Sequence, residues 1–206
     1  MAHPMSAHAF VYLASQSPRR AQLLDQLGVR HQPLLPGPEE DAEALEAVMP
    51  GEPAQHYVQR VTRLKLQAAL RRLKRRSLPP APVLCADTTV VLGRRILGKP
   101  EDDAQAQAML QALSGRTHRV LTAVAAGHGR ARCAALSISR VRFDPIAAQD
   151  LRAYVASGEP RGKAGSYAIQ SGAAQWISRI EGSYSGIMGL PLHETAAILR
   201  QLKVSF

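Results

Sequence analysis

The sequence predicts an α/β fold in a single domain. Apolar runs rich in strand-forming residues alternate with segments in which apolar residues recur every three or four positions, as in amphipathic helices. Two pairs of strand-like runs are joined by short glycine-containing turns, at residues 93–95 and 127–129, so the sheet cannot be all parallel. With 206 residues, of which 46% are hydrophobic, the chain is long enough for one packed unit. We expect a flexible terminus over residues 1–9 and one domain over 10–206.

Each element is predicted from its own pattern. Ser17 suits the N-cap of the first helix and Pro18 its first position, while Gly28 ends it. Asp102 and Asp103 favour the start of another helix. In chain order we expect strand 10–14, helix 17–28, a long basic helix ending before residue 79, strands 83–92 and 96–97, helix 102–114, strands 117–126 and 131–143, and helices 146–157 and 192–202.

The net charge of +10 comes mostly from one stretch of the chain. Between residues 53 and 86 there is no Asp or Glu, whereas residues 39–52 carry no Lys or Arg. The cations of the basic stretch are Arg60, Arg63, Lys65, Arg71, Arg72, Lys74, Arg75 and Arg76. Because only 4% of residues are aromatic, we interpret positions 71–76 as a solvated helix face rather than a nucleic-acid surface.

Several protein classes lose support from the sequence. Cys85 and Cys133 have no CxxC partner, so a disulfide framework and a thiolate metal site are both disfavoured. The seven histidines lack zinc-ligand spacing, and the glycine-rich C-terminal third contains neither a P-loop nor a GxGxxG motif. No stretch approaches the length of an apolar membrane span, so we expect a cytoplasmic protein with no membrane partner.

Three short motifs are candidates for chemistry. Residues 15–20, Ser-Gln-Ser-Pro-Arg-Arg, lead into a helix N-terminus and suit the binding of an anion. An ordinary helix cap followed by two surface arginines explains the same residues equally well. Asp87 interrupts an apolar strand, so its carboxylate is either paired structurally or kept for a reaction. Lys99, between Gly98 and Pro100, follows the first hairpin, so the chain can return its side chain to the same cleft as Asp87.

Taken in order, seven motifs resemble those of the Maf family of nucleoside-triphosphate pyrophosphatases. They are LASQSPRR, ADTTVVLG, GKP, MLQALSGRTHRVLTAVA, YVASGEP, KAGSYAIQ and GSYSGIMGLPLHET, spread from about residue 11 to about residue 202. The resemblance implies two lobes around a curved mixed sheet with a central cleft between them. It also implies hydrolysis of a nucleotide between its α and β phosphates, with a divalent cation, Mg²⁺ or Mn²⁺, and a homodimer.

The resemblance implies a set of site residues as well. The expected catalytic residues are Asp87, Lys99, Lys65 and Glu40, with Glu40 and Asp87 sharing the metal, and Glu39 or Asp41 as alternatives to Glu40. The expected substrate-binding residues are Arg19, Thr88, Gln170, Ser15, Arg20 and Lys163. Cations are needed there because a nucleoside triphosphate brings about four negative charges to the site.

Within the family, three positions resemble the subgroup that prefers dTTP and UTP. Arg19 follows Ser-Pro, Thr88 follows the aspartate, and Gln170 ends the AIQ motif. The resemblance therefore implies a dTTP/UTP pyrophosphatase that cleans the nucleotide pool, with CTP and modified pyrimidine nucleotides as further substrates. The runner-up substrate is 7-methyl-GTP, on which the sister subgroup acts. A different class of function is a nucleic-acid or septum-associated binding protein that uses the basic helix.

Overall fold

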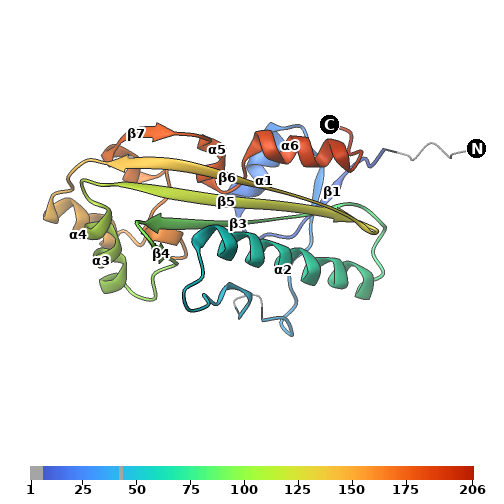
Figure 1. Cartoon of the computed structure of the whole chain (residues 1–206), viewed down its shortest axis with the longest axis horizontal. Coiled ribbons are helices and arrows are strands. Elements are labelled where there is room, and N and C mark those ends of the chain that lie inside the picture. The colour runs from blue at the N-terminus through green and yellow to red at the C-terminus, as the bar shows by residue number, and fades with distance from the viewer. Residues whose placement is uncertain (1–6, 42–43) are drawn as a thin grey trace, which may run out of the picture.

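The computed structural model describes residues 7–41 and 44–206 and forms one mixed seven-stranded sheet (Figure 1). Most of the predicted flexible terminus lies outside the described residues. The strand order is β2-β1-β3-β5-β6-β7, with β4 also pairing with β3. The strands are β1 (Val11–Leu13), β2 (His31–Pro33), β3 (Val83–Leu92), β4 (Arg95–Leu97), β5 (Thr117–His128), β6 (Ala131–Phe143) and β7 (Ile177–Glu181).

Helices cover both faces of this sheet. The α-helices are α1 (Pro18–Gln26), α2 (Ala54–Arg75), α3 (Asp103–Leu113), α4 (Ala148–Ala156), α5 (Tyr184–Met188) and α6 (Leu192–Gln201), and the 3₁₀ turns are η1 (Ala44–Glu46), η2 (Ala164–Ser166) and η3 (Gly172–Trp176). Helix α2 packs along one face of β3 and β5, and α5 and α6 pack against β5 and β6 from the other face.

The chain forms two lobes that share the three long strands. One end of the sheet carries α3, α4, β4 and β7, and the other carries α1, α6 and β1 (Figure 1). One buried cluster joins α3 and α4 to Phe143 and Trp176, and another joins α1 and α6 to β1. Strands β3, β5 and β6 run through both ends. The predicted two-lobed α/β fold with a mixed sheet is therefore confirmed.

A gap in the sheet lies along one edge of β3. Strand β1 pairs with β3 only as far as Leu84, and β4 begins to pair with β3 at Val90. On the opposite edge β3 is paired continuously with β5. Among the described strands, none covers residues 85–89 on the β1 side, so Asp87 and Thr88 lie on an open strand edge. Because side chains alternate along a strand, Asp87 points to one face of the sheet and Thr88 to the other.

The acidic segment folds back along the basic helix, which the sequence analysis missed. Its ion pairs run antiparallel to α2: Glu39 with Arg75, Glu40 with Arg72, Glu46 with Lys65, and Glu52 with Arg60. The interpretation of residues 71–76 as a solvated face is thus wrong for Arg72. Its side chain is 5% exposed because Glu40 and the Leu34 carbonyl satisfy its guanidinium.

Candidate functional site

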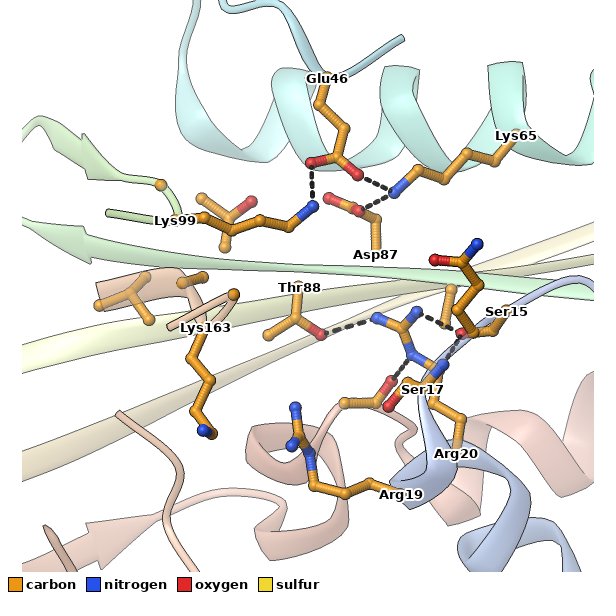
Figure 2. Close-up of a pocket in the computed structure, with 18 of the residues that line it drawn as sticks. Ser15, Ser17, Arg19, Arg20, Glu46, Lys65, Asp87, Thr88, Lys99 and Lys163 are labelled. Carbon is orange, nitrogen blue, oxygen red and sulfur yellow. Dashed lines mark hydrogen bonds and ion pairs between the residues drawn. The ribbon is translucent and has the colours of Figure 1, made fainter. Parts of the chain in front are cut away.

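The gap in the β3 edge opens into a cavity of about 670 Å³ between the two lobes. Its walls come from the loop before α1, the sheet-facing side of α2, β3, the segment after β4, and residues 161–170. All six predicted substrate-binding residues line it, together with Asp87, Lys65, Lys99 and Glu40. Figure 2 shows that the cavity extends to both faces of β3, with Asp87 on one side and Thr88 on the other.

On the α2 side, two carboxylates and two lysines form a linked cluster (Figure 2). Lys65 Nζ donates to Asp87 Oδ1 at 2.5 Å and to Glu46 Oε1 at 2.7 Å. Lys99 Nζ lies 3.0 Å from Glu46 Oε2. Asp87 Oδ2 accepts no hydrogen bond from the described residues. The Asp87 carboxylate therefore has one oxygen anchored to Lys65 and the other free.

Local structure explains why Lys65 reaches the cluster. Val61, Thr62, Leu66 and Ala69 form the buried stripe of α2 that packs on the sheet. Lys65 lies four residues after Val61, on the same helical face, so its side chain points at β3 rather than into solvent. The stem of Lys65 is thereby fixed by packing, and its ammonium emerges beside Asp87.

Burial and charge oppose each other within this cluster. Burial raises the pKa of Asp87, and Lys65 offsets that effect only in part. Burial lowers the pKa of Lys65, but the carboxylates of Asp87 and Glu46 outweigh it, so that pKa is raised. Burial raises the pKa of Glu46, and Lys65 and Lys99 reverse the shift to a net lowering. Lys65 is therefore held as a charged ammonium between two carboxylates in a partly desolvated site, and strongly perturbed groups of this kind are typical of functional sites.

On the opposite face of β3, Arg20 joins three segments of the chain. Its guanidinium donates to the Gly189 carbonyl at 2.8 Å, to Ser15 Oγ at 3.0 Å and to Thr88 Oγ1 at 3.5 Å. Burial lowers the pKa of Arg20, while Asp87 counteracts the shift. Ser17, at the start of α1, donates its backbone N–H to Ser15 Oγ rather than capping the helix with its hydroxyl. The first turn of α1 thus faces the cavity with its N–H groups free of a side-chain cap.

Two further cations flank the cavity at some distance from Asp87. Arg19 and Lys163 both point into it (Figure 2). Lys163 donates to the Glu159 carbonyl, and its pKa is lowered by burial and then by the charge of Arg19. Gln170 is exposed at the rim. These residues thus add two cations and an amide to the wall of the cavity.

The structure separates Glu40 from the Asp87 cluster. Both oxygens of Glu40 bind Arg72, and Oε1 also accepts from Arg75. The Arg72 hydrogen bond, with help from Arg75, lowers the pKa of Glu40 to about 2. Glu39 is likewise occupied by Arg75, and Asp41 accepts from the backbone of Ala44. None of the three acidic candidates forms a hydrogen bond or ion pair with Lys65, Lys99 or Asp87, so Glu40 lines the same cavity but lies outside the Asp87 cluster.

Glu46 is the acidic residue that the sequence analysis missed at this site. It lies on the short 3₁₀ turn η1, six residues beyond Glu40, and Tyr57 fixes the turn by donating to the Glu46 carbonyl at 2.9 Å. No motif in the sequence marks Glu46. The available signal is charge complementarity, because an acidic segment that precedes a basic helix is placed to pair with it.

Among the described residues, the site offers fewer than three clustered metal-ligating side chains. In residues 7–41 and 44–206, no group of three or more His, Cys, Asp and Glu side chains is arranged to hold a metal ion. A cation that binds through one or two carboxylates and completes its shell with water and phosphate is still compatible with Asp87 and Glu46.

None of the helices in residues 7–41 and 44–206 has the length and apolar character of a membrane-spanning segment.

Comparisons with known proteins find a family model, relatives in sequence and a structural match. A family model described as "Maf-like protein" matches residues 10–202. A protein of Polaromonas sp. strain JS666 named dTTP/UTP pyrophosphatase is 67% identical over 196 residues, 95% of this chain and 97% of that protein. A protein of the same name from Burkholderia pseudomallei strain K96243 is 60% identical over 206 residues, 99% of each chain. A nucleoside-triphosphatase/dITP/XTP pyrophosphatase structure from Mycobacterium abscessus aligns over 93% of this chain and 94% of its own with 14% identity and a TM-score of 0.44.

Proposed function

Because the chain belongs to the Maf-like protein family, we propose that it hydrolyses dTTP and UTP to the nucleoside monophosphate and pyrophosphate. Relatives that are 60–67% identical over nearly the whole chain carry the name dTTP/UTP pyrophosphatase. The structural observation that carries the proposal is the partly free Asp87 carboxylate, held by Lys65 in a cavity lined with cations.

The cations of the cavity are arranged to bind a triphosphate. Lys65 and Lys99 lie on the Asp87 side, and Arg19, Arg20 and Lys163 lie on the other side of β3. Phosphoryl transfer depends mainly on positioning and on neutralising charge that develops on the leaving group. Substrate phosphates can compete with Glu46 for the ammonium groups of Lys65 and Lys99, because all three side chains line the same cavity.

Asp87 is the residue we assign to activating the attacking water. Asp87 lines the cavity, its Oδ2 accepts no hydrogen bond from the described residues, and the raised pKa of its carboxyl group makes it a better proton acceptor than an exposed aspartate. Lys65 fixes the orientation of the carboxylate through Oδ1. Glu46 holds Lys65 and Lys99 in place through its two oxygens.

The carboxylates of Asp87 and Glu46 fit a divalent cation such as Mg²⁺ or Mn²⁺. Both are hard oxygen donors that meet at one ammonium, and Mg²⁺ in phosphate-transfer sites usually takes one or two carboxylates plus substrate phosphates. When bound, the cation would supply further charge neutralisation at the phosphates. Asp87 and Glu46 would then be shared between the cation and Lys65, because the same two carboxylates bind the Lys65 ammonium.

The assembly and location of the protein are further proposals. We propose a cytoplasmic homodimer. Large apolar side chains that are exposed on neighbouring elements support self-association: Ile138 on β6, Ile180 on β7 and Tyr184 on α5. Light scattering coupled to size-exclusion chromatography tests the dimer directly, because the mass that it measures for the eluting protein should be near twice 22.3 kDa.

The test of function is a panel of nucleotides under one set of conditions. Purified protein is incubated with Mg²⁺ or Mn²⁺ and dTTP, UTP, CTP, GTP, ITP or 7-methyl-GTP, and monophosphate, diphosphate, phosphate and pyrophosphate are resolved. Monophosphate and pyrophosphate from dTTP and UTP support the proposal, whereas turnover of 7-methyl-GTP alone transfers it to the runner-up substrate. The absence of turnover with either metal refutes the proposed activity. A parallel incubation with EDTA tests the metal, which is rejected if the rate is unchanged.

A further inference from the structure

A row of hydroxyl groups lies directly behind Thr88. Thr88 Oγ1 is 3.0 Å from Thr122 Oγ1 on the adjacent strand β5, and the two residues are register partners. Thr122 Oγ1 is in turn 2.7 Å from the Gly186 carbonyl oxygen in α5. Thr88 lines the cavity, whereas Thr122 is 1% exposed and does not reach it.

The direction of each hydrogen bond in this row is determined by chemistry. A carbonyl oxygen can only accept a hydrogen bond, so the single hydroxyl proton of Thr122 must be donated to the Gly186 carbonyl. The short contact between the two threonines then requires the proton of Thr88, which donates to Thr122. Arg20 Nη2 approaches Thr88 Oγ1 from the other side at 3.5 Å and can only donate.

Thr88 is therefore left with a lone pair and no proton for a ligand. Its one proton is donated to Thr122, and one of its two lone pairs accepts the hydrogen bond from Arg20. A hydroxyl with its proton turned away recognises donors such as N–H and does not favour unprotonated ring nitrogens or carbonyl oxygens. The imide of thymine and uracil presents an N–H at ring position 3, where cytosine presents a bare acceptor nitrogen.

We propose that Thr122 is a positioning residue for base recognition, which takes the proton of Thr88 so that Thr88 meets the substrate as an acceptor matched to the imide N–H of thymine and uracil. This inference rests on the proposed function, because it concerns the base of the same substrate. Thr122 acts entirely through Thr88, since it has no surface in the cavity.

The experiment measures kcat and KM for UTP and CTP in Thr122→Val, which keeps the shape but removes the hydroxyl. Without Thr122 Oγ1, the Thr88 proton is free to turn into the cavity, so we expect KM for UTP to rise about 3- to 10-fold, the range for one hydrogen bond. The preference for UTP over CTP should fall by a similar factor, with kcat little changed. Thr122→Ser keeps the hydroxyl and should restore both values.

A double-mutant cycle separates positioning from a general structural effect. In a Thr88→Val background, replacing Thr122 with Val should leave the UTP to CTP ratio unchanged, because no Thr88 proton remains to redirect. The matched control is Thr195→Val, a fully buried threonine on α6 outside the cavity, which should not alter the ratio in either background. If Thr122→Val does not fold, Thr122→Cys provides the same test with only a weak acceptor.

The outcomes distinguish this inference from the proposed function. An unchanged ratio in folded Thr122→Val, or an equal shift in both Thr88 backgrounds, overturns the role of Thr122 while leaving the activity intact. Failure of the unmodified protein to release pyrophosphate from UTP and dTTP refutes the proposed function first and this inference with it.

Discussion

Asp87 is the side chain whose chemistry is most directly testable. Asp87→Asn removes the negative charge and the proton acceptor while preserving the size of the side chain. We expect kcat for dTTP to fall by roughly 10²- to 10⁴-fold, the usual range for loss of a general base. Steady-state pyrophosphate release measures this, and circular dichroism checks the fold. Asp150→Asn, in the exposed first turn of α4, is the matched control. Undiminished turnover by folded Asp87→Asn would remove Asp87 from the mechanism.

Glu46 and Glu40 make a paired test of which acidic residue serves the site. Glu46→Gln weakens the hold on Lys65 and Lys99, so we expect kcat/KM to fall about 10- to 100-fold, as for other supporting residues of an active site. Glu40→Gln should leave turnover nearly unchanged but lower the melting temperature by about 5 °C, because the buried Arg72 loses its carboxylate. The reverse pattern, with activity lost only in Glu40→Gln, would return Glu40 to the catalytic set.

At the scale of elements, the loop before and within η2 is positioned by one glycine. Gly165 has a φ of +68°, and a Cβ there would lie 2.8 Å from Val90 Cγ1. Its N–H donates to the Gly98 carbonyl at 3.0 Å, which ties the loop to the segment that bears Lys99. The close approach of this loop to β3 places Lys163 at the cavity.

Gly165→Ala should therefore affect both stability and substrate binding. We expect a loss of about 1–3 kcal/mol in unfolding free energy from strain and the contact with Val90, and a higher KM for dTTP as Lys163 shifts. Gly158→Ala is the matched control, because Gly158 has a φ of +76° but nothing within 4 Å of the added Cβ. Denaturant unfolding and KM measurements on both variants separate backbone strain from displacement. An unchanged KM in Gly165→Ala would argue against a role for the loop in binding.

Elements with strong periodicity could be predicted from the sequence, and weakly patterned ones could not. Strand 83–92 and the buried stripe of α3, which includes Met109 and Leu110, match the structure because long apolar patterns dominate local preferences. Strands β2 and β7 were missed, since both are short and largely exposed, so they lack an apolar signature. Glu46 was missed for a related reason: its position depends on tertiary pairing with α2, which no local pattern encodes.

At the scale of the whole molecule, charge is organised by pairing across the sequence. The acidic segment neutralises much of the basic helix, from Glu52 on Arg60 near its start to Glu39 on Arg75 at its end. Part of the positive charge that the sequence concentrates on the basic helix is thus neutralised by ion pairs within the fold. This arrangement, together with the few aromatic residues, disfavours the alternative of a nucleic-acid-binding helix.

The stability of the whole protein should depend on pH through one buried histidine. His118 is 2% exposed in the cluster that contains Phe143, and its Nε2 lies 2.7 Å from the Tyr167 hydroxyl. Burial lowers the pKa of His118 to about 4, against 6.5 for an exposed imidazole. Between these values the unfolded chain binds a proton that the folded protein does not, so the stabilisation present above pH 6.5 is lost as the pH falls towards 4.

From pH 7.5 to 5, this linkage should cost about 2 kcal/mol of unfolding free energy, at 1.36 kcal/mol per pKa unit. His118→Gln removes the titrating group, so we expect it to be less stable at pH 7.5 but to lose about 2 kcal/mol less than the wild type on acidification. Urea unfolding at both pH values measures the difference, with the exposed His193→Gln as control. An equal pH dependence of the unfolding free energy in His118→Gln and the wild type would mean that His118 is not the group that links acidification to unfolding.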